Sequence, residues 1–435
     1  MTPLEYQPVP NWSNSVEIEI EFKTDIFESR SGNETRRALR ETPRRRLYYT
    51  TTLHSEGLQE FRNLVARYGG ESWAVADFTR AEKIELPAGE VSSFPWVTPY
   101  WIRTGERLAF VKKGKSQIRQ VVSTIDDVVV LDSAVVLEPG TKVAPVMYGR
   151  LLDGVKLTRQ TNAVGTARIS FSEDPATARD PVDPLAEEPW PTYRGKRVFP
   201  VRPNWRVEPA EKFEREIDVL DFGYGSVDFW LPQRESKWSA DFVSSSRTAD
   251  VVSAAMDFFC RRKGRREAFY CPTWTADLTL AVPMAAGATE IVVKGASAAK
   301  LFAGSLVYRN LALVSRSALF PVGILDAVAE GGNTRLFLDA AVPDAVADVK
   351  MISWFLMARF SSDTFKVEWY TNAVGDFDVN VISTVEMFYE IQAAEDRILF
   401  NGDYLIMSPY YPPPSAFVLT EVDGEALLVS GDYAG

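Results

Sequence analysis

Thr161-Asn162-Ala163-Val164-Gly165 recurs unchanged as Thr371-Asn372-Ala373-Val374-Gly375, 210 residues further along the chain. Two shorter matches occur in the same order, at offsets of 193 and 207: Pro10-Asn11-Trp12 with Pro203-Asn204-Trp205, and Leu131-Asp132-Ser133-Ala134 with Leu338-Asp339-Ala340-Ala341. Ordered matches whose offset grows slowly in one direction are typical of two diverged copies of one unit with a few insertions. The sequence therefore predicts a tandem duplication.

Each copy is predicted to be a β-sandwich that carries one packed helix. Alternation of apolar and polar residues with period two predicts strands, each with one buried face, over 16–22, 366–370 and 377–381. The repeated pentapeptides are expected to be hairpin loops in which Gly165 and Gly375 are available for a positive φ. Apolar residues at helical spacing, followed by glycine, predict helices over 56–68, with Ser55 as the N-cap, and over 249–262. The predicted fold class is mainly β.

The chain between each helix and its hairpin is expected to fold as a small inserted β-barrel, and 290–295 and 301–308 are expected to be strands of the second one. Segments 194–199 and 401–406 loosely resemble each other and are predicted to be edge strands that close the two sandwiches. The predicted division is sandwich one over 1–80 plus 148–171, its insert over 81–147, a Pro-rich linker over 172–202, sandwich two over 203–279 plus 352–395, its insert over 280–351, and a Pro- and Tyr-rich extension over 396–435.

The composition excludes several classes of site. The 435 residues include one histidine, His54, and two cysteines, Cys260 and Cys271, so neither a structural zinc centre nor a histidine-based metal site is expected. The cysteines are either buried thiols or one local bridge. No apolar run approaches the ~20 residues of a transmembrane helix, and the N-terminus lacks the pattern of a secretory signal. A net charge of −11 argues against a dedicated nucleic-acid binder.

Six arginines lie within eleven residues, where their guanidinium groups could bind phosphate or carboxylate: Arg36, Arg37, Arg40, Arg44, Arg45 and Arg46. The alternative is a solvated face or a contact between subunits, and we favour it because neighbouring acids offset the charge. Residues 1–171 contain 23 Lys and Arg against 21 Asp and Glu, whereas residues 203–435 contain 20 against 32. The acidic second half is therefore a suitable partner for these arginines if subunits pack side by side.

No catalytic constellation stands out, and no enzyme activity, cofactor or metal is expected. The pairs Asp126-Asp127 and Glu187-Glu188 could be the acid and base of a glycosidase, but no pattern places either pair in a cleft. Gly223 and Gly225 are expected to be turn glycines, since no phosphate-loop pattern accompanies them. The 11 Trp, 16 Tyr and 25 Phe could form a sugar-binding platform, although packing in the sandwich cores is the preferred account.

Four segments of the first copy resemble the distal tail proteins of long-tailed bacteriophages and their relatives in gene transfer agents. They are Ser29-Arg30-Ser31-Gly32-Asn33-Glu34-Thr35-Arg36-Arg37, Pro43-Arg44-Arg45-Arg46-Leu47-Tyr48-Tyr49, Leu58-Gln59-Glu60-Phe61 in the predicted helix, and Gly69-Gly70-Glu71-Ser72-Trp73. In that family a Ser-Gly-x-Glu-x-Arg turn leads to a strand, a Leu-x-x-Phe helix, and a glycine before an aromatic strand. The resemblance covers about residues 10–80 and, more weakly, 203–280, where the Ser-Gly-x-Glu-x-Arg motif is lost.

The resemblance implies a structural protein of the virion tail, assembled in the cytoplasm of the bacterial host. Members of the family form a ring, commonly hexameric, that joins the tail tube to the hub and fibres. The expected partners are therefore further copies of the chain, the tail tube protein, the tail hub protein and tail fibres. The duplication predicts that three chains form a pseudo-hexameric ring, with a true hexamer as the alternative. A carbohydrate- or receptor-binding tail-tip module is the second candidate function, and a carboxylate-dependent glycosidase is the third.

Overall fold

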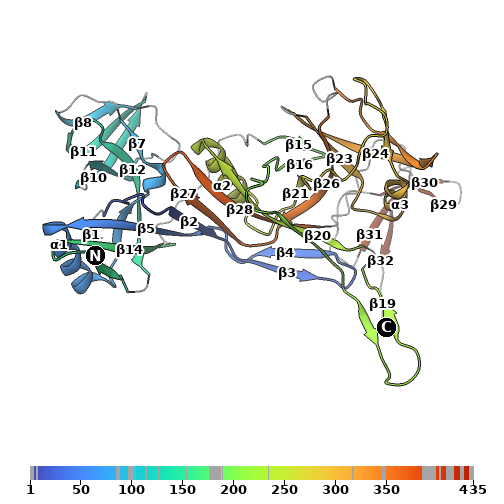
Figure 1. Cartoon of the computed structure of the whole chain (residues 1–435), viewed down its shortest axis with the longest axis horizontal. Coiled ribbons are helices and arrows are strands. Elements are labelled where there is room, and N and C mark those ends of the chain that lie inside the picture. Colours follow the sequence, from blue (N-terminus) through green and yellow to red (C-terminus); the bar gives the residue numbers. More distant parts are fainter. Residues whose placement is uncertain are drawn as a thin grey trace. The chain divides into compact units, whose positions relative to one another are not determined.

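The computed structural model describes residues 4–384 with short gaps, and the backbone of four further strands towards the C-terminus. The gaps within 4–384 are 6–7, 85–88, 97–101, 103, 113–114, 126, 153, 176–187, 189, 234, 316–317 and 344–348. The chain divides into two compact units, residues 1–385 and 386–435. It is mainly β, as predicted, and almost all strand pairs are antiparallel (Figure 1). We call residues 4–175 the first half and residues 188–384 the second half.

In the first half, one sheet runs in the order β2, β5, β14 and β13, and β14 also pairs with β12, which leads through β6 to β1. The strands are β1 Leu4–Glu5, β2 Val16–Glu21, β5 Arg44–His54, β6 Trp73–Ala76, β12 Lys142–Leu151, β13 Leu157–Arg159 and β14 Val164–Glu173. Helix α1 (Ser55–Tyr68) packs on β5 and β14 and buries Leu58 and Phe61. Alternate residues of β2 and β5 are buried, as their period-two pattern predicts.

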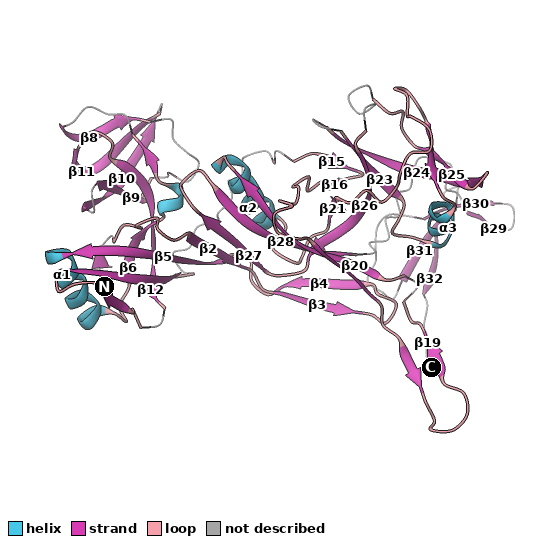
Figure 2. Ribbon diagram, viewed as in Figure 1, coloured by secondary structure: helices cyan, strands magenta, loops and turns pink. Residues whose placement is uncertain are grey.

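The second half has the same strand order. Its sheet runs β17, β20, β28 and β27, and β28 also pairs with β26, which leads to β21. The strands are β17 Ala210–Glu214, β20 Lys237–Ser246, β21 Phe269–Pro272, β26 Met351–Phe360, β27 Thr364–Trp369 and β28 Gly375–Ser383. Helix α2 (Ala249–Arg261) packs on β20, β27 and β28, and both long helices lie against the strands in Figure 2.

Strand registers agree between the two halves, at offsets that lie between 193 and 210. Equivalent pairs of opposite residues are Leu53–Gly165 and Ser246–Gly375, Leu157–Ala167 and Val367–Phe377, and Trp73–Gly149 and Phe269–Ala358. Leu53 and Ser246 lie 193 residues apart. Leu157 and Val367, and likewise Ala167 and Phe377, lie 210 residues apart. The two halves therefore pair their strands alike, residue for residue.

The repeated motifs also form the same turns. Thr161 Oγ1 accepts hydrogen bonds from the backbone N–H groups of Ala163 and Val164 at 3.2 and 3.0 Å, and Thr371 Oγ1 accepts the equivalent pair at 3.1 and 3.0 Å. The asparagine of each Pro-Asn-Trp motif donates from Nδ2 to a hydroxyl of the neighbouring strand: Asn11 to Thr52 at 2.9 Å and Asn204 to Ser245 at 2.6 Å. The motifs are repeated because the same backbone turns require the same side-chain acceptors and donors.

The expectation of a positive φ at the two repeated glycines is wrong. Neither Gly165 nor Gly375 lies in the left-handed region. A Cβ atom at Gly165 would lie 3.2 Å from the backbone oxygen of Thr158, and one at Gly375 would lie 3.2 Å from that of Glu368. Glycine is favoured at both positions because a Cβ atom would lie closer to the opposite strand of the hairpin than Cβ atoms usually do.

Each half carries a four-stranded antiparallel insert. The insert pairs with β12 in the first half and with β26 in the second half. The order is β12, β9, β10, β11 and β8 in the first half, and β26, β23, β24, β25 and β22 in the second. The bounds are β7 Glu82–Lys83, β8 Gly89–Pro95, β9 Arg107–Lys112, β10 Lys115–Ile125, β11 Val128–Leu137, β22 Glu290–Lys294, β23 Asn310–Val314, β24 Leu319–Glu330 and β25 Asn333–Leu338, with a short helix η1 at Phe78–Arg80. The first insert has a hydrophobic core of its own around Phe94, Val121 and Val135.

Two local predictions are wrong. Residues 301–308 do not form a strand, because helix α3 spans Ser297–Gly304, where three alanines and a leucine favour a helix. Ser55 is not the N-cap of α1: it is the first helical residue, and His54 occupies the cap position without a side-chain hydrogen bond. The helices themselves are confirmed, to within one residue at each end.

The predicted linker and edge strands also differ from the structure. Residues 190–201 pack into the second half, where Phe199 is fully buried, so the linker over 172–202 is too long. Val198 pairs with Tyr270 of the second half, so 194–199 does not close the first sandwich. Residues 403–406 belong to a four-stranded sheet in the separate C-terminal unit.

The remaining strands are β15 Thr192–Tyr193, β16 Lys196–Arg197, β29 Ile398–Phe400, β30 Asp403–Met407, β31 Ala416–Glu421 and β32 Ala426–Ser430.

Two further hairpins extend from the sheet edges at equivalent places. One consists of β3 (Thr24–Glu28) and β4 (Glu34–Ala38), and the other of β18 (Asp218–Leu220) and β19 (Asp228–Trp230). The register of the second hairpin is that of the first shifted by 193 residues in both strands. These hairpins and the strands that precede them form the candidate site.

Candidate interaction surface

The two halves join through one antiparallel strand pair. Strand β2 of the first half pairs on one side with β5 and on the other with β27 of the second half, from Val16 opposite Trp369 to Glu21 opposite Thr364. Alternate β2 residues are buried, Ile20 completely. The junction therefore makes one continuous sheet from the two halves.

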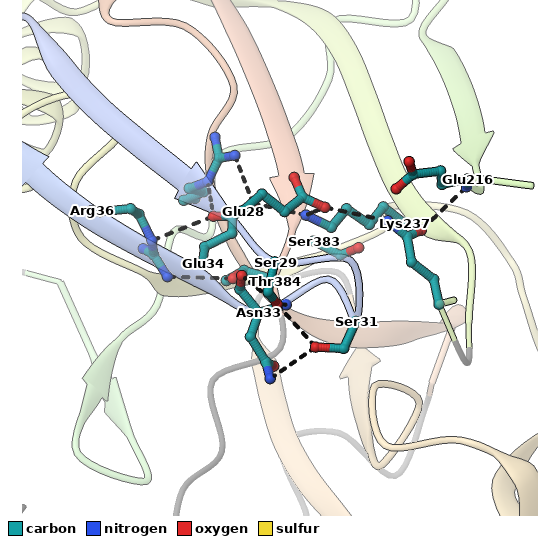
Figure 3. A network of polar contacts seen from close by, with 12 residues as sticks. Glu28, Ser29, Ser31, Asn33, Glu34, Arg36, Glu216, Lys237, Ser383 and Thr384 are labelled. Atoms are coloured by element: carbon teal, nitrogen blue, oxygen red, sulfur yellow. Dashed lines mark hydrogen bonds and ion pairs between the residues drawn. The ribbon is translucent and has the colours of Figure 1, made fainter. Parts of the chain in front are cut away.

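The β3–β4 hairpin of the first half covers this junction and lies on the second half. The Glu34 side chain is fully buried and accepts hydrogen bonds from Arg359 at 2.7 and 2.9 Å and from Lys237 at 2.8 Å (Figure 3). Burial alone would raise the pKa of Glu34, but the hydrogen bonds and charges of Arg359 and Lys237 outweigh it and lower the pKa to about 2. Lys237 also binds Glu28 at 2.8 Å.

Further polar contacts join the same hairpin region to the second half. Thr24 donates from its backbone N–H and from Oγ1 to the carboxylate of Asp363, at 2.6 and 2.8 Å. Arg36 donates to the backbone oxygen of Arg266 at 2.8 Å, and Lys263 binds Glu41. The first half is therefore held on the second by charged and polar groups along the whole length of the hairpin.

The structure gives different environments to the six arginines singled out in the sequence. Arg36 contacts the second half, as described above. Arg45 is buried and donates two hydrogen bonds to Glu173 at 2.5 and 2.6 Å; burial alone would lower the pKa of Arg45, but Glu173 outweighs this and raises it. Arg46 binds Glu19 and Glu21, and Arg40 binds Glu21. Arg37 and Arg44 are exposed and form no ion pair within the described part of the chain.

Both outer edges of the continuous sheet are open. Strand β17, the counterpart of β2, pairs with β20, and all five of its side chains are exposed. Strand β13, the counterpart of β27, pairs with β14. Among the described residues no second strand covers either edge. One open edge is thus β17, the counterpart of β2, and the other is β13, the counterpart of β27. These are the counterparts of the two strands that pair at the internal junction.

The β18–β19 hairpin extends from the open β17 edge and projects away from the sheet (Figures 1 and 2). It is rich in exposed apolar side chains. Twelve of the 25 exposed large apolar side chains of the described chain lie between 205 and 231, so the exposure is concentrated on one segment: Trp205, Val207, Phe213, Ile217, Val219, Leu220, Phe222, Tyr224, Val227, Phe229, Trp230 and Leu231. Exposed apolar clusters of this kind are typical of interaction sites on protein surfaces, which makes this segment a candidate interaction surface.

Only the turn of this surface is predictable from the sequence. Gly223 and Gly225 have positive φ values of 77° and 93°, as expected of turn glycines. The run Asp221-Phe222-Gly223-Tyr224-Gly225 around them alternates aromatic residues with glycine, so its periodicity does not distinguish it from a strand packed in a sandwich core. Strand pairing at the two edges involves backbone groups, which composition does not reveal.

Of the acids considered for catalysis, the structure describes Asp127 and Glu188, while Asp126 and Glu187 lie outside the described residues. Glu188 forms ion pairs with Arg197 and Arg262. Cys260 and Cys271 are buried free thiols, and burial raises the pKa of Cys271 to about 12. Within the described residues, no group of three His, Cys, Asp or Glu side chains could hold a metal ion, and no helix is long and apolar enough to span a membrane. No protein-family model matches the chain, and no curated protein matches its sequence.

Proposed function

We propose that the chain carries two copies of one β-sandwich unit and is a structural protein of a bacteriophage tail tip, where it forms a ring that joins the tail tube to the hub and fibres. The resemblance of residues 10–80 to distal tail proteins supports the family. The agreement of turns and strand registers between the halves supports the duplication. A scaffold of this kind needs contact surfaces rather than reactive groups.

One observation carries the proposal. The chain's internal junction pairs β2 with β27, and its two open edges are the counterparts of these strands. Transferring the offsets of 193 and 210 to the pair Glu17–Glu368 places Ala210 of one chain opposite Thr158 of the next. A contact between two different surfaces repeats head to tail, and it forms a closed ring when the rotation closes. Three chains then supply six similar units, which gives a threefold ring with approximate sixfold symmetry.

The mass of the purified full-length chain tests this proposal. Mass photometry and electron microscopy are expected to give a particle three times the 48.7 kDa of one chain, seen as a ring of six lobes. A ring of six chains would keep the head-to-tail contact but contradict the trimer. A particle that stays monomeric as concentration rises, in the presence and absence of the tail tube protein, would contradict the ring.

A variant of the open edge separates ring formation from folding. Phe213 on β17 is 62% exposed, whereas its counterpart Ile20 is fully buried in the internal junction. Phe213→Glu is expected to leave the chain folded and to abolish the ring, because burying an aromatic side chain contributes about 2–3 kcal/mol at each junction and a carboxylate opposes it. Val282→Glu, at a position 57% exposed on the second half, is the matched control and should assemble normally.

The exposed aromatics also favour a second candidate, a carbohydrate- or receptor-binding module. Trp230 and Tyr224 could stack on sugar rings, as aromatic side chains do in such sites. The β18–β19 hairpin, however, is the counterpart of one that packs on protein within this chain. A glycan array separates the two: specific binding that is lost in Trp230→Ala, while the ring persists, would favour the receptor-binding role.

A further inference from the structure

We infer that the β18–β19 hairpin is an arm that docks on the first half of the next chain, where Asp221 of the arm meets Arg44 of the neighbour. This inference rests on the proposed ring and adds which surfaces meet away from the paired strands. It is drawn from the way the β3–β4 hairpin docks within one chain.

The internal contact provides the template. The β3–β4 hairpin places two carboxylates on two cations of the second half: Glu28 on Lys237, and Glu34 on both Lys237 and Arg359. Lys237 begins β20, and Arg359 lies near the end of β26. The docking surface is thus the pair of adjacent strand ends beside β28, where both cations bind Glu34 of the hairpin; Figure 3 labels Lys237 and Glu34.

In the first half, the counterparts of these two cations are exposed to solvent. At the offset of 193, Lys237 corresponds to Arg44 at the start of β5. At the offset of 209, which relates β12 to β26, Arg359 corresponds to Arg150. Both arginines are exposed, and neither forms an ion pair within the described part of the chain, whereas their counterparts are bound by the β3–β4 hairpin. Arg44 and Arg150 therefore mark an empty copy of the docking surface.

The arm carries the counterpart of one of the two template carboxylates, and its overall charge is negative. Asp221 lies 193 residues after Glu28, the residue that binds Lys237. Residues 216–231 contain four acids, at 216, 218, 221 and 228, and no lysine or arginine, so the arm is negative where the empty surface is positive. The arm is also continuous with β17, the edge that pairs with the neighbour in the proposed ring.

A second copy of this chain is therefore the occupant that fits the arm. It supplies the two arginines, at the spacing that the internal contact uses, and it covers apolar side chains such as Phe229 and Leu220, which are 66% and 51% exposed in the single chain. Within one chain, the two hairpins also contact each other. Arg30, near the tip of the β3–β4 hairpin, forms an ion pair with Asp218 and lies over the ring of Trp230 at the base of the β18–β19 hairpin. Repetition around a ring would link each hairpin to the next in a continuous belt.

Site-specific cross-linking tests the inference. Full-length chains carrying either Asp221→Cys or Arg44→Cys are co-expressed, purified and treated with a short bismaleimide, and the products are separated by denaturing electrophoresis. Since the native cysteines are buried, only the introduced thiols react, and each variant treated alone gives the background of dimer formed between like thiols. We expect about tenfold more dimer than from Arg44→Cys with Asp326→Cys, a control on the exposed face of the second insert, because docking raises the effective concentration of the two thiols. The double variant Glu28→Cys, Lys237→Cys should give the internal cross-link, detected by mass spectrometry.

The possible failures can be told apart. Rings that assemble normally but give no more dimer than the Asp326→Cys control would overturn the docking of the arm and leave the ring intact. Chains that stay monomeric and give no dimer would overturn the ring and the arm together. Rings in which a cross-link from Asp221→Cys forms to a tail protein instead would assign the arm to a different partner.

Discussion

Replacing Glu34 by glutamine is expected to destabilise the contact between the two halves by about 3 kcal/mol. The carboxylate is fully buried between Arg359 and Lys237, and its pKa is lowered from 4.5 to about 2. Each unit of difference in pKa corresponds to about 1.4 kcal/mol, so Glu34 contributes about 3 kcal/mol to the free energy of unfolding at neutral pH. The value agrees with the 3–5 kcal/mol lost when one partner of a buried ion pair is removed, because Glu34→Gln leaves buried Arg359 without its counter-charge and Lys237 with Glu28 alone.

The pH dependence gives the sharper measurement. Because the folded-state pKa is the lower one, Glu34 stabilises the protein fully above about pH 4.5, and this contribution is lost as the pH falls towards 2. Guanidinium unfolding of wild type and Glu34→Gln should therefore differ by about 3 kcal/mol at pH 7, and the difference should shrink steadily below pH 4.5. Glu60→Gln on the exposed face of α1 is the control and should change stability by less than about 0.5 kcal/mol. A loss at pH 7 below about 1 kcal/mol, or one that persists unchanged at pH 2.5, would refute the reasoning.

Two further predictions concern groups inside the halves. Arg45→Ala should lower the free energy of unfolding by about 3–5 kcal/mol, because it leaves Glu173 buried without its partner, whereas Arg44→Ala on the same strand should leave the stability of the single chain unchanged; thermal unfolding of both variants compares them directly. Cys271 is fully buried with a pKa raised to about 12, so its labelling by a thiol reagent at pH 8 should follow unfolding of the second half, and rapid labelling of the native protein would contradict its burial.

The sequence predicts those features of the fold that depend on local pattern. The strands over 16–22 and 377–381 and both long helices follow from periodicity, and the repeat offsets anticipate which strands have equivalent registers. The errors arise where a tertiary contact decides. The preference for glycine at positions 165 and 375 comes from the close approach of a neighbouring strand, and the pattern within one strand does not reveal this approach. Segment 301–308 alternates weakly enough that helix propensity decides its structure.

The candidate surface was only partly predictable, for a related physical reason. The arginines from Arg36 to Arg46 attract attention as one cluster, but alternation along β5 points neighbouring residues to opposite faces. Arg45 is consequently buried against Glu173, while Arg44 faces solvent one residue away. Open strand edges have no signature in the sequence, since any strand can be an edge; they become visible only when the pairing partners of every strand are known.

The internal junction and its proposed counterpart between chains differ in one residue that bears on assembly. At the offset of 193, the position of buried Glu34 is occupied by Val227, so the arm cannot place a carboxylate between the two cations at this point. The internal contact is therefore the more tightly fixed of the two, because its ion pair is desolvated and costly to break. The contact between chains relies instead on apolar side chains and on exposed ion pairs, which are worth only about 0–1 kcal/mol each and weaken with salt. In the proposed ring, a chain built in this way would fold first as one rigid third and then close the ring through weaker, reversible contacts. Raising the salt concentration should therefore slow assembly of the ring without separating the two halves of the chain.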